Sequence, residues 1–133
     1  MGKTIKRRVL VVEDERLVAD TLGLIFEKNG FDCRIAYTGV EALACADNFS
    51  PELLLCDISM PGMSGLDIAT ALTEKCPECR VIFLTAHYNN LGSARKWTRT
   101  HGKPSLVITK PLLPALLLQE VDALLLGKSG DAA

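Results

Sequence analysis

The sequence predicts an α/β protein in which five parallel strands form one open sheet covered by helices on both faces. Two observations predict this class. Five short apolar runs show no alternation of apolar and polar residues, which is typical of strands buried on both faces. Stretches with helical periodicity separate these runs, so a strand and a helix alternate five times along the chain, as in a parallel sheet with crossover helices.

The composition fits one globular domain. The chain has 133 residues, 48% of them hydrophobic, and a net charge of −1. This near-neutral charge gives no electrostatic reason to expect nucleic acid or a membrane as a direct partner. No apolar run approaches the roughly 20 residues that span a bilayer, so we expect a cytoplasmic protein. We expect residues 1–7 to form a basic leader, residues 8–126 the domain and residues 127–133 a flexible tail.

The first two strand–helix units are recognised by changes of period. Residues 8–12 are the first apolar run, and apolar residues at helical spacing follow from Arg16 to an Asn-Gly stop signal at 29–30. Residues 33–36 are predicted as a short strand. The segment 38–41, Thr-Gly-Val-Glu, has the spacing of a capping box and predicts a helix that reaches about residue 48.

The third and fourth units follow the same pattern. Residues 53–56 are four apolar residues in a row, and they run directly into Asp57. A Pro-Gly turn comes next, and Ser64 has the features of a helix N-cap. Residues 81–84 are predicted as the fourth strand, and residues 90–100 as a polar helix.

The fifth unit ends in an unusually apolar helix. Residues 106–109 are the fifth strand, Pro114 lies in the first turn of the helix, and we expect the helix to reach about Leu126. Three residues fill one buried stripe, and further leucines exceed what that stripe needs: Leu117, Val121 and Leu124, then Leu112, Leu113, Leu116, Leu118 and Leu126. Two interpretations stay open, a wide contact with the core or a surface for a homodimer or output partner formed with the fourth helix.

The cysteines are predicted to be reduced thiols. Their odd number and the lack of a secretory signal argue against a disulfide framework: Cys33, Cys45, Cys56, Cys76 and Cys79. Residues 76–79 form a lone CxxC, for which a redox or metal role is the alternative.

Polar residues stand where four of the predicted strands end. In a parallel sheet these ends share one edge, so Glu13 and Asp14, Asp57, Thr85 and Lys110 are expected to be neighbours in space. Like charges a few ångströms apart repel by about 4 kcal/mol at an effective dielectric near 20. One lysine does not neutralise three carboxylates, whereas a hard divalent cation does, and an all-oxygen site suits Mg²⁺. Mg²⁺ commonly shares a substrate phosphate, so the site predicts phosphoryl chemistry.

Roles follow for the individual residues. Asp57 is the predicted nucleophile that becomes an acyl phosphate. Asp14 and Asp57 are predicted to hold Mg²⁺, with Glu13 acting through a water and the backbone carbonyl of Ser59 as a further ligand.

Two other residues are expected to contact the phosphoryl group. Lys110 would pair with one phosphoryl oxygen, and the Thr85 hydroxyl would donate to another. A cis bond between Lys110 and Pro111 would aim the ammonium back into the site.

Four motifs in this order and spacing resemble the receiver domain of two-component response regulators: Val-Val-Glu-Asp-Glu at 11–15, Asp-Ile-Ser-Met-Pro-Gly-Met-Ser-Gly at 57–65, Leu-Thr-Ala at 84–86 and Ile-Thr-Lys-Pro at 108–111. The resemblance covers residues 8–126. It implies a flavodoxin-like, doubly wound sheet of order 2-1-3-4-5. It also implies Mg²⁺-dependent transfer of a phosphoryl group from the phosphohistidine of a sensor histidine kinase, or from a phosphotransfer protein, to Asp57. Thr85 and Lys110 would then be the switch and phosphate-pairing residues of a signalling phosphoacceptor that catalyses only its own phosphorylation and dephosphorylation.

The sequence departs from the family pattern at Val107. Receivers usually carry an aromatic residue three positions before the lysine, and valine does not operate the usual threonine–aromatic relay. The segment 101–105 is also slightly long. Both departures concern the output face and leave the phosphoryl chemistry intact.

Two other functions are the alternatives. An aspartyl-phosphate phosphohydrolase also uses an aspartate nucleophile, but it wants a second aspartate two residues later, where this chain has Ser59. A receiver-like interaction domain that is not phosphorylated is the other alternative, and the intact acidic cluster argues against it. The sequence leaves open whether the chain acts alone or belongs to a longer regulator.

Overall fold

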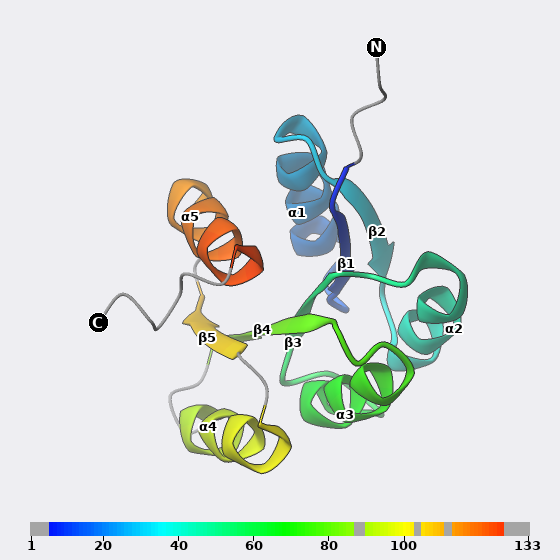
Figure 1. Ribbon diagram of the computed structural model, residues 1–133, viewed down its shortest axis with the longest axis vertical. Coiled ribbons are helices and arrows are strands. Elements are labelled where there is room, and N and C mark those ends of the chain that lie inside the picture. Colours follow the sequence, from blue (N-terminus) through cyan, green and yellow to red (C-terminus); the bar gives the residue numbers. More distant parts are fainter. Residues whose placement is uncertain (1–5, 87–89, 103–104, 111–112, 127–133) are drawn as a thin grey trace.

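A computed structural model describes residues 6–86, 90–102, 105–110 and 113–126 (Figure 1). Within these residues the chain forms five strands and five helices that alternate strictly: β1 Arg8–Val12, α1 Arg16–Lys28, β2 Asp32–Ala36, α2 Gly39–Phe49, β3 Leu53–Asp57, α3 Gly65–Lys75, β4 Arg80–Thr85, α4 Asn90–His101, β5 Ser105–Thr109 and α5 Pro114–Leu125. The strands are all parallel and lie in the order β2-β1-β3-β4-β5. The predicted fold class and strand order are therefore confirmed.

The helices cover both faces of the sheet, with α1 and α5 on one side and α2, α3 and α4 on the other (Figure 1). Successive strand residues point to opposite faces. On β3, Leu54 and Cys56 join the core beneath α2, α3 and α4, whereas Leu53 and Leu55 join the core beneath α1 and α5. Every residue of β3 is buried, which explains why its sequence is a continuous apolar run.

Side-chain caps begin two of the helices, as the sequence predicts. Thr38 Oγ1 accepts a hydrogen bond from the backbone N–H of Glu41 at 3.1 Å at the start of α2. Ser64 Oγ accepts one from the N–H of Asp67 at 3.2 Å at the start of α3. Each cap satisfies a backbone donor that the first helical turn leaves without a partner.

The start of α3 lies against the end of β3. The N–H of Gly65 donates to the carbonyl of Ile58 at 2.9 Å. A Cβ atom at Gly65 would stand 2.2 Å from the carbonyl oxygen of Asp57, so only glycine permits this approach. Packing at Gly65 therefore fixes the backbone that carries the Asp57 side chain.

Trp97 anchors α4 to the sheet. The residue is 6% exposed, and its ring meets Phe83 of β4 edge to face, with 5.2 Å between ring centroids. Its indole N–H donates to Thr70 Oγ1 on α3 at 2.9 Å, so the polar end of the ring is satisfied as well.

Helix α5 is more apolar than its core contact requires. Leu117, Val121 and Leu124 are buried, as predicted. By contrast, Leu113 and Leu116 are 62% and 54% exposed, so a wide core contact does not account for them. Leu112 lies outside the described residues, as do the Lys110–Pro111 bond, most of the expected leader and the expected tail.

The remaining observations concern membrane-spanning helices and the cysteines. In the part of the chain that the structure describes, no helix is long and apolar enough to cross a membrane. All five cysteines are free, and burial raises the pKa of the Cys33 thiol to about 12.

Candidate functional site

Backbone hydrogen bonds extend the sheet past the strand ends and hold the loops of one edge in place. The N–H of Glu13 donates to the carbonyl of Ala36 at 3.1 Å, and the N–H of Lys110 donates to the carbonyl of Thr85 at 2.8 Å. These bonds fix the residues that follow β1 and β5 to the ends of β2 and β4, at the edge of the sheet where Asp57 ends the central strand β3.

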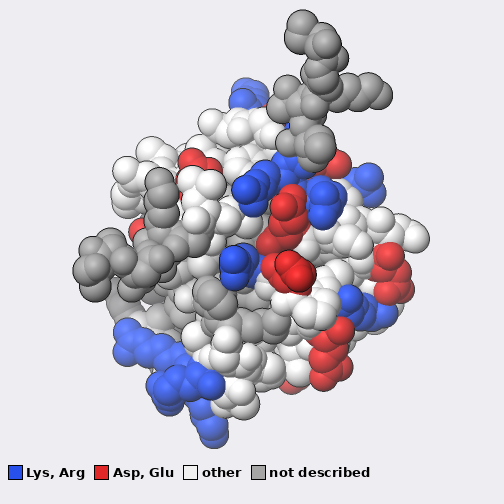
Figure 2. Space-filling model, viewed as in Figure 1, with Lys and Arg blue, Asp and Glu red and all other residues white. Residues whose placement is uncertain are grey.

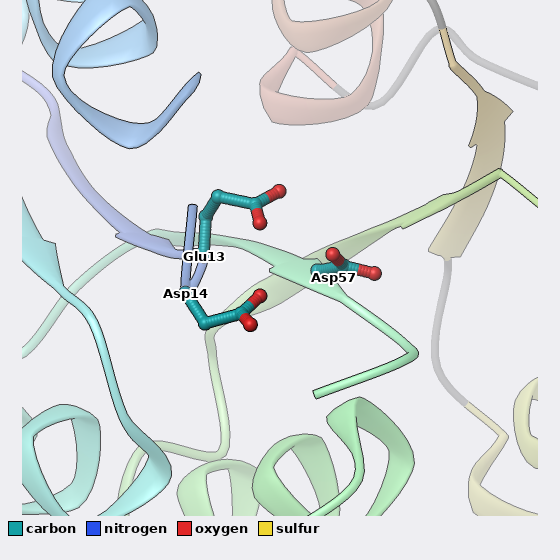
Figure 3. Close-up of side chains that lie close together, drawn as sticks. All are labelled: Glu13, Asp14 and Asp57. Carbon is teal, nitrogen blue, oxygen red and sulfur yellow. The ribbon is translucent and has the colours of Figure 1, made fainter. Parts of the chain in front are cut away.

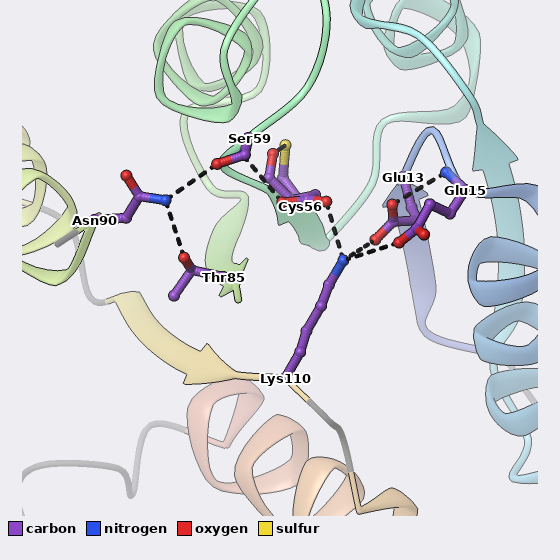
Figure 4. A network of polar contacts seen from close by, with 8 residues as sticks. Glu13, Glu15, Cys56, Ser59, Thr85, Asn90 and Lys110 are labelled. Atoms are coloured by element: carbon purple, nitrogen blue, oxygen red, sulfur yellow. Dashed lines mark hydrogen bonds and ion pairs between the residues drawn. The ribbon is translucent and has the colours of Figure 1, made fainter. Parts of the chain in front are cut away.

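Lys110 is the centre of an ion-pair cluster (Figure 4). Its Nζ lies 2.8 Å from Glu13 Oε1, 3.0 Å from Asp57 Oδ2 and 3.7 Å from Glu15 Oε1. Glu13 and Asp57 are buried, whereas Glu15 is exposed. The ammonium group therefore compensates two buried carboxylates directly, which makes their burial tolerable. The contact between Lys110 and Glu15 was not predicted. The sequence indicates it only through the position of Glu15 in the acidic triplet at residues 13–15.

The ionisation of this cluster reflects burial and pairing. Burial raises the pKa of the Glu13 carboxyl, and the hydrogen bond from Lys110 opposes this increase without cancelling it. Burial lowers the pKa of Lys110, but hydrogen bonds to Glu13 and Asp57 outweigh it, so the net pKa is raised. Lys110 is thus held firmly in its charged form.

The three predicted carboxylates converge (Figure 3). One ligand oxygen from each of Glu13, Asp14 and Asp57 lies within 4.8 Å of the other two, and Asp14 is exposed to solvent. Among the described residues, Lys110 is the cation that pairs with this group, and it pairs with Glu13 and Asp57. The cluster therefore keeps an excess of negative charge on the solvent side. Three hard oxygen donors with unbalanced charge fit a divalent cation such as Mg²⁺.

A small pocket of about 280 Å³ opens at the acidic cluster. The described residues that line it come from the carboxyl end of β3 and from the loops after four strands: Asp14, Glu15, Asp57, Ser59, Ala86 and Lys110. Both Asp57 oxygens are fixed, because the N–H of Ser59 donates to Oδ1 at 3.0 Å and Lys110 contacts Oδ2. The pocket thus presents an oriented carboxylate, a cation and acidic ligands to a small polar group entering from solvent.

Thr85 lies next to this pocket but does not line it. Its side chain is fully buried, and its Oγ1 accepts a hydrogen bond from Asn90 Nδ2 at 3.0 Å (Figure 4). The same Asn90 nitrogen donates to Ser59 Oγ at 3.1 Å. The structure therefore brings Glu13, Asp14, Asp57 and Lys110 together with Ser59, and it connects Thr85 to them through Asn90, a residue that sequence reasoning missed.

A larger apolar groove of about 510 Å³ runs between α1 and α5. Lys110 lies at both this groove and the small pocket. Leu17, on α1, is 80% exposed at the groove. Asp14 and Asp57 of the acidic cluster line the smaller pocket and are not among the described residues that line the larger groove, so the smaller pocket is the candidate site.

Comparison with known proteins agrees with this geometry. The family model described as the response regulator receiver domain matches residues 9–122. The DNA-binding response regulator MtrA of Mycobacterium tuberculosis (strain ATCC 25618 / H37Rv) is 35% identical over 69 residues, which are 52% of this chain and 30% of MtrA. MtrA of Mycobacterium leprae is 34% identical over 68 residues, or 51% of this chain and 30% of that protein. The matching segment thus covers less than a third of these curated relatives.

Solved structures agree on the fold. The response regulator receiver domain protein (CheY-like) of Methanospirillum hungatei superimposes with a TM-score of 0.84 at 27% identity, over 93% of this chain and 97% of that one. NtrX of Brucella abortus superimposes with a TM-score of 0.82 at 26% identity, over 93% of this chain but 28% of NtrX.

Proposed function

Because the chain belongs to the response regulator receiver domain family of two-component signalling, we propose that Asp57 is its phosphoacceptor and that a histidine kinase or phosphotransfer protein is the donor. One observation carries the proposal: the Asp57 carboxylate lies at the end of the central strand, 3.0 Å from the Lys110 ammonium and beside two further carboxylates. The relatives named as DNA-binding regulators extend well beyond the matching segment, so we propose only the receiver's part of such a function for this chain.

The proposed reaction is a direct phosphoryl transfer. A carboxylate oxygen of Asp57 attacks the phosphorus of the donor, the phosphorus–nitrogen bond breaks, and the imidazole leaves with the electron pair of that bond. Lys110 pairs with a phosphoryl oxygen on the product acyl phosphate, as a point charge. Catalysis consists of positioning and charge compensation, and Asp57 is already oriented by the N–H of Ser59.

Asp14 and Asp57 would hold Mg²⁺, with Glu13 acting through a water and the Ser59 carbonyl as a further ligand. When bound, the ion supplies compensation for the charge of the cluster and of the phosphoryl oxygens. Support comes from the convergence of the three carboxylates and from the excess of negative charge near Asp14.

The chain is proposed to act once per signal rather than to turn over an external substrate. Ser59 stands two residues after Asp57, where a phosphohydrolase would need an acidic group to protonate a leaving alcohol. The Ser59 hydroxyl is instead engaged as an acceptor for Asn90. Loss of phosphate from Asp57 would therefore be the chain's own dephosphorylation.

Phosphorylation can be tested with acetyl phosphate and Mg²⁺. We expect a mass increase of one phosphoryl group in the unaltered chain and none in Asp57→Ala. Asp47→Asn is the matched control, because Asp47 is an exposed carboxylate that pairs with Lys75 away from the site. A mass increase that persists in Asp57→Ala, or its absence with both acetyl phosphate and a phosphohistidine protein, would refute the proposal.

The groove between α1 and α5 is the proposed contact surface for the donor protein. It contains Lys110 and exposed apolar side chains such as Leu17, so a protein seated there reaches the phosphoacceptor pocket. Leu17→Ser should slow transfer from a phosphohistidine protein and leave transfer from acetyl phosphate unchanged. Val40→Ser is the control, because Val40 is 76% exposed on α2, which covers the opposite face of the sheet. Equal slowing with both donors would contradict this assignment.

The proposed surface for a homodimer or an output partner involves α4 and α5. Leu113 and Leu116 border a groove of about 420 Å³ over β5. Helix α4 carries the basic residues Arg95, Lys96 and Arg99, and basic side chains gather at the lower left of Figure 2, where Figure 1 places α4. Sedimentation velocity with and without phosphorylation tests a homodimer, which Leu116→Ser should weaken.

A further inference from the structure

We propose that Asn90 is a latch: its side-chain amide holds Thr85 away from the phosphoacceptor pocket, and phosphorylation of Asp57 releases α4 by breaking the Asn90–Thr85 hydrogen bond. This inference rests on the proposed function of Asp57. Asn90 acts through Thr85 and is therefore a positioning residue.

A continuous chain of hydrogen bonds links Asp57 to α4. Asp57 Oδ1 accepts from the N–H of Ser59 at 3.0 Å. The Ser59 hydroxyl oxygen accepts from Asn90 Nδ2 at 3.1 Å, and the same nitrogen donates to Thr85 Oγ1 at 3.0 Å (Figure 4). An amide nitrogen has two protons, so one side chain serves both acceptors and both of its donors are used.

The position of Asn90 allows this chain of hydrogen bonds to connect the loop after β3 to helix α4. Asn90 is the first residue of α4, so its side chain ties the start of that helix to the loop after β3 and to the end of β4. Val107, on the neighbouring strand β5, has no side-chain polar atom with which to follow Thr85. Asn90 supplies a direct hydrogen-bonded connection from Thr85 to α4.

The two functions of the Thr85 hydroxyl compete. Thr85 is fully buried and is not among the described residues that line the phosphoacceptor pocket. Accepting from Asn90 does not use the Thr85 proton, so in the proposed latch the competition is one of position: to donate to a phosphoryl oxygen on Asp57, the Thr85 side chain rotates toward the pocket, and this rotation carries Oγ1 away from Asn90 Nδ2. The bond to Asn90 is then made only in the unphosphorylated state, and it opposes phosphorylation by the free energy that it contributes to that state.

Removing the latch should consequently strengthen binding of a phosphoryl group. The net contribution of one hydrogen bond corresponds to about a two- to tenfold change in an equilibrium constant. We expect Asn90→Ala to bind beryllofluoride, a phosphoryl mimic that needs Mg²⁺ and a free carboxylate, about two- to tenfold more tightly than the unaltered chain. By reciprocity, a partner that binds released α4 would favour phosphorylation of Asp57.

The chain carries its own probe for this experiment. Trp97 is the only tryptophan in the sequence, lies on α4 and contacts Phe83 of β4. Titration with beryllofluoride and excess Mg²⁺ should change the Trp97 emission as α4 is released, and fluorine NMR gives an independent binding curve. Ser93→Ala is the matched control, because Ser93 is an exposed residue in the next turn of α4 and its replacement should leave the affinity unchanged.

A double-mutant cycle separates the latch from a general effect on α4. Thr85→Val keeps the buried volume but removes the hydroxyl, so Asn90→Ala should no longer alter beryllofluoride affinity in that background. An unchanged affinity in Asn90→Ala, or the same gain with and without the Thr85 hydroxyl, would overturn the latch. If the unaltered chain itself fails to bind beryllofluoride, while remaining folded by circular dichroism, the proposed function of Asp57 fails instead.

Discussion

Asp14 is expected to destabilise the metal-free protein, and Asp14→Asn measures by how much. The substitution removes one charge and keeps the shape of the side chain. An Asp14 oxygen lies within 4.8 Å of oxygens of Glu13 and Asp57, and Lys110 pairs with those two residues. At that distance each like-charge pair costs about 1 kcal/mol in water and about 3.5 kcal/mol at an effective dielectric of 20.

The lower part of this range applies, because Asp14 is exposed and Lys110 offsets much of the charge of its neighbours. We therefore expect Asp14→Asn to raise the free energy of unfolding by about 1 kcal/mol in the presence of a chelator, which corresponds to about 3–5 °C in melting temperature. In excess Mg²⁺ the order should reverse, because the unaltered chain gains stability from binding the ion and the variant loses a ligand.

Urea denaturation followed by circular dichroism, with EDTA or with Mg²⁺, is the assay. Asp47→Asn serves as the control, since its exposed carboxylate pairs with Lys75 and lies outside the cluster. A variant at Asp14 that is less stable in EDTA, or that keeps the full stabilisation by Mg²⁺, would refute the reasoning about charge and ligation together.

Three other predictions concern the frame of the site. Gly65→Ala should abolish phosphorylation by acetyl phosphate, because the new Cβ would stand 2.2 Å from the Asp57 carbonyl oxygen. The control is Gly92→Ala, which has open space around it in α4 and should be phosphorylated normally and be more stable by about 1 kcal/mol. Normal phosphorylation of Gly65→Ala would count against the packing argument. The pKa of Lys110 is raised above its ordinary value of 10.5, so the stability that its charged form contributes is present below pH 10.5 and is lost as the pH rises through the raised pKa. The urea midpoint of the unaltered chain should therefore converge on that of Lys110→Met in this alkaline range. Parallel pH profiles of the two proteins would contradict the pairing. Thr38→Ala should lower the free energy of unfolding by about 1 kcal/mol through loss of the α2 cap, as measured by urea denaturation, with no change in phosphorylation; an unchanged stability would show that the cap contributes nothing.

Most of the fold could be predicted from the sequence because local signals and burial agree. The continuous apolar run of β3 requires cover on both faces, and the caps at Thr38 and Ser64 begin helices where they are predicted. The convergence of Glu13 and Asp57 was predictable for the same reason, since parallel strands bring their carboxyl ends to one edge. Such inferences need only the order of the elements.

Contacts that depend on the direction of a side chain could not be predicted. Asn90 begins a helix, and asparagine at that place is equally explained as a local cap; nothing in its sequence neighbourhood indicates that it reaches Ser59 and Thr85. The leucines of α5 show the same limit. Helical spacing identifies the buried stripe at Leu117 but does not tell how far the neighbouring helices extend over Leu113.

The difference in burial between β3 and β5 predicts that β3 is rigid and that β5 is the strand able to change conformation. β3 is enclosed on both sides and bonded to strands at both edges, whereas β5 is one of the two edge strands and its residues are half-buried or exposed. Amide protons of β3 should exchange with solvent only on global unfolding, and those of β5 through local opening. Asp57 therefore lies on the most rigid strand of the sheet, whereas the edge formed by β5 can rearrange at a lower free-energy cost. Repeated phosphorylation and dephosphorylation then do not require the backbone of Asp57 to move.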